Sequence, residues 1–232
     1  MTGKGAGDGR RGAINMIDRF TRAERAVHHV TALLLFGCLI TAAMLYIPEL
    51  AAAVGRRGLI KSIHIWAGVA LPVPALAGLL SKAFRGDVRR LNGFRPHDWE
   101  WLRRGDRRAV RGGRGVIPVG KFNAGQKLNA AFMAGAILVM LGTGLMLTFP
   151  DPFPVRLRTG ATFVHDWLTL AIFAVTFGHL WYALRDPGAM AGMLTGRVTP
   201  EWAARHHPGW LDEQNPDPSA LDTVGSSADE MS

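Results

Sequence analysis

The chain contains eight histidines, and five of them lie in or beside long apolar runs: His28, His29, His64, His165 and His179. An ionisable side chain at membrane depth is costly unless it has a partner, which makes each of the five a candidate functional residue. For any single one of them, the alternative is a hydrogen bond between helices or a position at the membrane interface. We expect His97, His206 and His207 to be solvated surface residues.

The spacing of two of these histidines indicates a shared helix face. His165 and His179 are 14 residues apart, which on a straight helix separates them by roughly 21 Å along the axis and keeps them within about 40° of one face. Neutral imidazole is a good ligand for iron, and two imidazoles fill both axial positions of a haem. Two histidine pairs at two depths would therefore bind two electron-transferring haems of b type.

Four apolar runs must position these histidines. Charged residues are missing from 26–47, 63–81, 128–149 and 167–184. Each run is long enough to cross ~30 Å of hydrocarbon as a helix, and the runs are too long and too unalternating for barrel strands. We predict an all-α integral membrane four-helix bundle within residues 19–210, with helices at about 26–47, 60–82, 127–149 and 162–185.

The distribution of Lys and Arg predicts the orientation of the bundle. The N-terminal segment, the connection between the second and third helices and the C-terminal tail hold 22 of the 27 basic residues. By the positive-inside rule both termini and the long connection face the cytoplasm, as expected for a multi-pass protein of the bacterial inner membrane. The net charge of +9 is then a topology signal, and we expect contact with membrane lipid and no binding of nucleic acid.

The segments outside the bundle are less regular. Residues 1–18 are expected to be a flexible cytoplasmic segment without a removable signal peptide, and residues 211–232 a disordered cytoplasmic tail. In the long connection, "HDWEWLRR" predicts a short interfacial helix with Trp99 and Trp101 at the headgroup level. The "RRGDRRAVRGGRG" that follows predicts no fixed fold. The single cysteine, Cys38, cannot build an iron–sulfur cluster.

Depth pairs the histidines under this orientation. His64 and His165 both begin helices that enter the membrane from outside, so they lie at one level. His28 or His29 begins the first helix from inside and lies at the level of His179. Adjacent helical residues diverge by about 100°, so His28 and His29 cannot both point into the bundle, and physical reasoning alone does not choose between them.

These features resemble the cytochrome b, or gamma, subunit of respiratory formate dehydrogenases from about residue 19 to residue 210. The similar stretches are "ERAVHH", "SIHIWAG", "GKFNAGQK", the histidine pair of the fourth helix and "EWAARHHPGW". The resemblance implies that His64 and His165 hold the haem iron near the periplasm and that His28 and His179 hold the one near the cytoplasm. It selects His28 over His29 because the ligand of the family follows an Arg-Ala-x pattern.

The resemblance also implies an electron acceptor and partners. A quinone, menaquinone or ubiquinone, would bind beside the inner haem at Asn123, Gln126 and His179. The partners would be an iron–sulfur subunit with a transmembrane anchor and a molybdenum or tungsten catalytic subunit, so this chain is not expected to oxidise formate alone. Without the resemblance, Asn123 and Gln126 would be interpreted as capping and polar surface residues at a helix start.

Other functions remain open at this point. A cytochrome b subunit of a related hydrogenase or thiosulfate reductase would share the bundle and the histidines. A cofactor-free membrane anchor would use the histidines only for packing. A membrane di-iron oxygenase needs clustered ligands at HxxxH or HxxHH spacings, and these spacings do not occur in the sequence.

Overall fold

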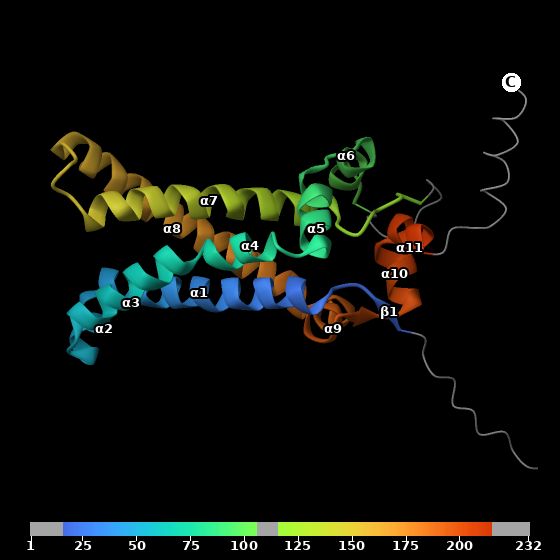
Figure 1. Ribbon diagram of the computed structural model, residues 1–232, viewed down its shortest axis with the longest axis horizontal. Coiled ribbons are helices and arrows are strands. Elements are labelled where there is room, and N and C mark those ends of the chain that lie inside the picture. The colour runs from blue at the N-terminus through green and yellow to red at the C-terminus, as the bar shows by residue number, and fades with distance from the viewer. Residues whose placement is uncertain (1–15, 106–115, 215–232) are drawn as a thin grey trace, which may run out of the picture.

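The computed structural model describes residues 16–105 and 116–214 (Figure 1). Within these residues, four helical segments are long and apolar enough to cross a membrane: Arg22–Tyr46, Arg57–Gly78, Ala124–Thr148 and Val155–Leu184. The predicted set of four membrane-spanning helices is confirmed, and the chain is a multi-pass membrane protein. The orientation of the termini stays a prediction.

Local side-chain contacts and prolines set where the first span begins and where the second span is interrupted. Helix α1 (Arg22–Tyr46) starts at a capping box in which Thr21 and Glu24 each accept from the other's backbone N–H. The short α2 (Pro48–Val54) then leads to α3 (Arg57–Ala70). The second span, predicted as one helix, is interrupted after Ala70 and resumes as α4 (Val73–Gly78), because proline cannot donate to the helical ladder.

The last two spans begin earlier than predicted. Helix α7 (Ala124–Thr148) begins three residues before the expected start and is capped by Asn123. Helix α8 (Val155–Leu184) follows Pro154 directly and so includes Arg156, Arg158 and Asp166, which lie before the apolar run 167–184. A basic residue in the first turns of a helix does not prevent it from forming, so the boundaries of apolar runs underestimate the helices.

The long helices lie side by side along the long axis of the molecule (Figure 1). Helix α1 packs against α3 and α4, α7 packs against α8, and α3 joins the two pairs by packing against α7. Helices α5 (Lys82–Asn92) and α6 (Pro96–Arg103) pack against α7 at the end where α1 begins. The other end of the bundle carries α2 and the α7–α8 connection.

The C-terminal elements close the end of the bundle that holds α5 and α6 (Figure 1). They are α9 (Pro187–Thr195), α10 (Pro200–His206) and α11 (Pro208–Gln214). Strand β1 (Ile17–Asp18) pairs antiparallel with β2 (Arg197–Val198). Gly196 precedes β2 at φ +89°, and a Cβ there would lie 2.6 Å from the Phe20 carbonyl oxygen, so this turn requires glycine.

One expected surface residue is buried, which corrects the sequence-based prediction. His207 is only 2% exposed, because its Nδ1 lies 2.7 Å from the Gly120 carbonyl and its Nε2 lies 2.9 Å from Arg19 Nη2. Trp210 is 1% exposed in the same region, and its backbone N–H donates to the carbonyl of Val119. The tail is therefore attached to the segment that precedes α7.

The connecting segments differ in part from the expectations. The helix predicted in "HDWEWLRR" is present as α6, where Trp99 is exposed and Trp101 packs over Gly125 of α7. Its place at a membrane interface stays a prediction. Residues 17–18 and 211–214, which we expected to be irregular, lie in β1 and α11. The rest of both terminal segments and residues 106–115 of the Arg-rich stretch lie outside the described residues.

Candidate functional site

The histidines expected at the outer level lie opposite each other. His64 extends from α3 and His165 from α8, and their ring centres are 6.3 Å apart with an angle of 67° between the ring planes. His165 packs over Gly144 of α7, where a Cβ would lie 3.4 Å from its Cε1. The two rings therefore come from opposite halves of the bundle.

A threonine hydroxyl contacts each ring of this pair at Nδ1. Thr41 Oγ1 lies 2.9 Å from Nδ1 of His64, and Thr143 Oγ1 lies 2.9 Å from Nδ1 of His165. Each hydroxyl also donates to a carbonyl in its own helix, at 2.6 Å for Thr41 and 2.8 Å for Thr143. A hydroxyl has one hydrogen, and each threonine already donates it to a carbonyl. The threonine oxygen therefore accepts from Nδ1–H of the histidine, which leaves the lone pair of Nε2 free.

The histidines expected at the inner level also meet. His28 of α1 and His179 of α8 have ring centres 6.3 Å apart, with 59° between the planes. The neighbouring His29 contacts the Met193 carbonyl of α9 through Nε2 at 3.2 Å. His28, and not His29, is thus the residue of the first helix that faces His179.

The geometry of both pairs fits a metal ion between two imidazoles. An imidazole nitrogen binds a first-row metal ion at about 2 Å, and the ring centre lies roughly 1 Å beyond that nitrogen. Two rings on opposite sides of one ion therefore have centres about 6 Å apart, which agrees with the 6.3 Å of both pairs. A threonine that accepts from Nδ1–H is the kind of partner that fixes a ligating imidazole.

Glycines beside the histidines leave room for a flat ligand. Gly68 lies one turn after His64, and Gly178 precedes His179; a Cβ at either glycine would meet no other atom within 4 Å. The same holds for Gly37, Gly135 and Gly142. Gly78 differs, because a Cβ there would lie 2.8 Å from Val27, so its function is close helix packing.

The expected quinone-binding residues form a helix cap. Asn123 Oδ1 accepts from the backbone N–H of Gln126 at 2.9 Å, and Gln126 Oε1 accepts from that of Asn123 at 3.0 Å. This is the capping interpretation reached without the resemblance. It uses only the amide oxygens, so the two NH₂ groups keep their ability to donate to a carbonyl.

A buried ionic cluster lies at the same end of the bundle and was not predicted from the sequence. Lys121 Nζ donates to Glu24 Oε1 at 2.8 Å and to Asp87 Oδ2 at 2.6 Å. The three residues are 7%, 7% and 6% exposed. Because the partners of Lys121 lie 97 and 34 residues away along the chain, no local pattern indicates that they meet.

Burial changes the acid–base properties of this region. It raises the pKa of Asp87 from 3.8 to about 7, with a further rise from the Glu24 carboxyl group and opposition from Lys121. Burial also lowers the pKa of Arg19 to about 10 and, together with the adjacent Arg19, places the pKa of His207 well below its ordinary value. His207 is therefore neutral at pH 7 and accepts from Arg19.

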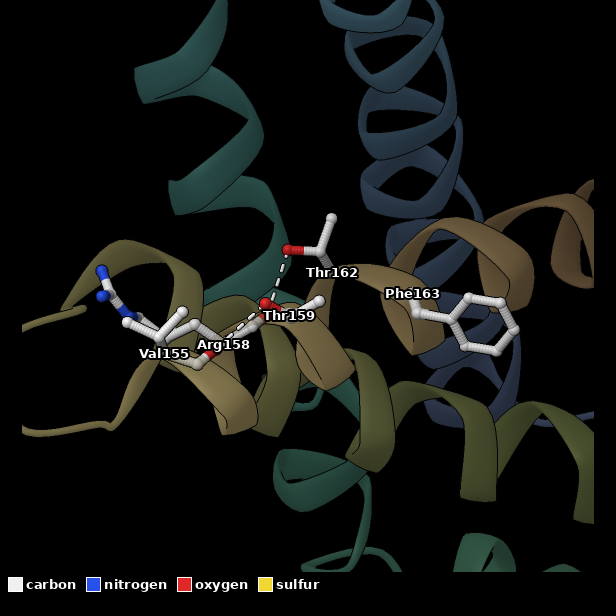
Figure 2. A pocket seen from close by; sticks show the side chains of 5 residues that line it. All are labelled: Val155, Arg158, Thr159, Thr162 and Phe163. Atoms are coloured by element: carbon white, nitrogen blue, oxygen red, sulfur yellow. Dashed lines mark hydrogen bonds between the residues drawn. The ribbon is translucent and has the colours of Figure 1, made fainter.

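An open hollow marks the other end of α8 (Figure 2). It is lined by Val155, Arg158, Thr159, Thr162 and Phe163. The hydroxyls of Thr159 and Thr162 donate to carbonyls one turn earlier in the helix. Arg158 Nε is buried without a hydrogen-bond partner in the described part of the chain. No residue predicted from the sequence to bind a cofactor lines this hollow.

The comparisons with known proteins all lead to cytochrome b proteins. Residues 19–196 match the family described as prokaryotic cytochrome b561. The cytochrome b556(Fdn) subunit of nitrate-inducible formate dehydrogenase from Escherichia coli K12 is 32% identical over 101 residues, which cover 42% of this chain and 46% of that protein. This alignment thus spans less than half of the relative.

Two further relatives carry related names. The cytochrome b556(fdo) subunit of formate dehydrogenase from Escherichia coli K12 is 26% identical over 205 residues, covering 85% of this chain and 92% of that protein. The cytochrome b556 subunit of formate dehydrogenase from Haemophilus influenzae is 29% identical over 119 residues, covering 45% and 50%. The longer alignment extends the likeness over most of both chains.

The raised pKa of Asp87 predicts a pH dependence of stability. A carboxyl group with a folded pKa of about 7 and an ordinary value of 3.8 stabilises the fold fully below about pH 4 and loses that contribution as the pH rises through 7. In Asp87→Asn this loss should disappear, so the thermal midpoint in detergent should fall less between about pH 5 and pH 8 than in the wild type. An unchanged slope in Asp87→Asn would contradict the assignment.

Proposed function

This chain belongs to the prokaryotic cytochrome b561 family, and we propose that it is the membrane cytochrome b subunit of a respiratory formate dehydrogenase. It would pass electrons from an iron–sulfur partner on the periplasmic side, through two haems b, to a quinone near the cytoplasmic face. The observation that carries the proposal is the pair of facing imidazoles at each of two depths, with ring centres 6.3 Å apart in both.

The residues that would hold the haems are the four paired histidines. His64 and His165 would bind the outer haem iron, and His28 and His179 the inner one. Bound there, the haems would supply one-electron transfer between the two faces of the membrane. With an imidazole on both sides of each iron, no axial position stays open for oxygen or substrate, which suits electron transfer rather than oxygen chemistry.

The quinone would bind at the start of α7. The NH₂ groups of Asn123 and Gln126 can donate to a quinone carbonyl while their oxygens keep capping the helix. His179 belongs to this site as the inner ligand nearest to it in the inferred arrangement. A cap supports this role because it fixes both amides on a rigid helix end.

The direction of transfer would conserve energy. Each electron driven inward moves against the membrane potential at about 2.3 kcal/mol per 100 mV. Quinone reduction on the inner side would also consume cytoplasmic protons. Both effects contribute to proton-motive force, which is the expected purpose of a respiratory subunit with one redox centre at each face.

The partners follow from the names of the relatives. The three relatives are all cytochrome b556 subunits of formate dehydrogenases, which supports an iron–sulfur partner with a transmembrane anchor and a molybdenum or tungsten catalytic partner. The described part of this chain is a helical bundle with short appended elements, so formate oxidation is assigned to the partner subunits.

Haem content tests the central proposal. A pyridine haemochrome assay on the purified chain should give about two haems b per chain. His64→Ala should lose the outer haem and keep the inner one, whereas His29→Ala should keep both because His29 bonds to α9. Absence of haem from the wild type, or retention of both haems in His64→Ala, would refute the assignment.

The threonine contacts predict a change in redox potential. A hydrogen bond from Nδ1–H raises the basicity of a ligating imidazole and favours the oxidised iron. Thr41→Val should therefore raise the midpoint potential of the outer haem, on the order of tens of mV, and leave the inner one unchanged. Thr169→Val is the matched control, because Thr169 donates only to the His165 carbonyl. Equal shifts of both haems in Thr41→Val would argue against a local effect.

Purification of the intact complex tests the partners. A tagged chain isolated from its native membranes should bring with it an iron–sulfur protein and a molybdenum or tungsten enzyme, and formate should reduce its haems. The chain purified alone should show no formate oxidation. A nickel-containing enzyme in the same preparation would instead indicate the cytochrome b subunit of a hydrogenase.

A further inference from the structure

The Lys121 cluster lines an open hollow at the end of the bundle where α1 begins. Residues of α1, α5, the segment before α7 and the turn before β2 line this hollow, and the cluster residues Glu24, Asp87 and Lys121 are among them. All three are less than a tenth exposed. The cluster is thus buried from lipid and bulk water but adjoins a route to one aqueous side.

The charges in the cluster do not balance. One ammonium group is shared by two carboxylates, at 2.8 and 2.6 Å. Two buried carboxylates close together cannot both ionise without a large cost, so the group as a whole tends to hold one proton. The stoichiometry, two acids to one base, is that of a site that can bind and release a proton.

Most of the other charged groups that line the hollow have partners elsewhere in the described structure. Arg19 donates to the Lys121 carbonyl and contacts His207, and Arg25 donates to carbonyls at the end of α9. Arg197 pairs with Asp18, and Arg90 pairs with Glu213. Arg22, at the start of α1, also lines the hollow. Lys121 is the cation that contacts both buried carboxylates.

The cluster connects the two sites on which the proposed function depends. Lys121 precedes Asn123 by two residues, which even a fully extended chain spans in about 7 Å. Glu24 precedes His28 by four residues, or one helical turn of about 6 Å. One carboxylate of the cluster is thus one helical turn from His28, and the lysine that holds both carboxylates is two residues from the helix start that would bind the quinone.

We propose that Asp87, acting with Glu24 and Lys121, is the proton donor for quinone reduction at the inner end of the bundle. The inference rests on the proposed function and adds the residues that deliver protons. Quinone takes up two electrons, which arrive through the inner histidine pair, and two protons. For each proton, the O–H bond of the carboxyl group breaks, the proton moves to a quinone oxygen, and the carboxylate is reprotonated from water in the hollow.

The acid strength of Asp87 suits this role. Burial raises its pKa to about 7, so near neutral pH the group is protonated about half of the time and can both give and regain a proton. Electrons that arrive at the inner end add negative charge nearby, which favours protonation. Lys121 limits this effect and holds both carboxylates in place.

Reoxidation of the haems by quinone tests the proposal. Native membranes that contain the full complex, with the haems reduced by stoichiometric dithionite, are mixed with menadione, and the haem b absorbance is followed by stopped flow from about pH 5 to about pH 9. Asp87→Asn should slow reoxidation at least ~10-fold at pH 7 and remove the change in rate near that pH. Asp87→Glu should restore most of the rate, which a packing defect would not predict.

A second buried carboxylate supplies the control. Asp98 accepts from Lys127 Nζ at 2.7 Å, so Asp98→Asn removes a buried acid at the same end and should keep the wild-type rate and pH profile. Wild-type rates and pH profile in Asp87→Asn with full haem content would overturn the inference and leave the proposed function intact. If Asp87→Asn binds no haem, Glu24→Gln decides: a slowed reoxidation with full haem content supports the inference, and a wild-type rate and pH profile overturn it.

A wild-type complex that menadione does not reoxidise would count against the quinone assignment itself. The rate of haem reduction, recorded in the same membranes, separates the two cases. A proton-delivery defect leaves reduction at the wild-type rate and slows only reoxidation, whereas loss of a haem ligand changes the spectrum and the haem content.

Discussion

The bundle depends on the need of every polar group at membrane depth for a partner. The imidazoles of His64 and His165 meet this need at Nδ1 through threonines that already donate to their own helices. This arrangement sets which nitrogen carries the hydrogen and so which nitrogen is free to bind a metal ion. The two threonines come from α1 and α7, whereas His64 and His165 come from α3 and α8. The outer pair thus requires all four spans to be assembled before its geometry exists.

The two ends of the bundle use different chemistry for similar histidine pairs. The outer pair is supported by neutral hydroxyls, whereas the inner pair adjoins the ionic cluster of Lys121 and the buried Arg19–His207 contact. Buried charges cost desolvation free energy, so grouping them at one end must serve a purpose that offsets this cost. Part of that purpose is mechanical, because Lys121 joins α1, α5 and the segment before α7. Lys121 also links α1, which carries His28, to the segment just before the Asn123 cap of α7.

Local patterns predicted the spans and the pairing of the histidines, but not the contacts around them. Apolar runs located the four helices. Depth matched His64 with His165 and left His28 or His29 as the partner of His179; the structure brings His64 to His165 and His28 to His179. The start of α7 was placed three residues late because its apolar run begins after the Asn123 cap, and α8 begins after Pro154 without a side-chain cap that could mark its start. Thr41 and Thr143 gave no signal, since threonine is common in apolar helices. Contacts such as Arg19 with His207, 188 residues apart, arise only from the assembled fold.

The structure contains its own comparison for the ionic cluster. Lys127 is as buried as Lys121, at 7% exposure, yet it neutralises a single buried carboxylate, that of Asp98, and completes its bonding with the Gly93 carbonyl. One lysine paired with one carboxylate is enough to hold two segments together. The second carboxylate on Lys121 adds desolvation cost and leaves the group short of one positive charge. Since a one-to-one pair is enough to hold two segments together, the second carboxylate is the feature that the proposed proton donor would use.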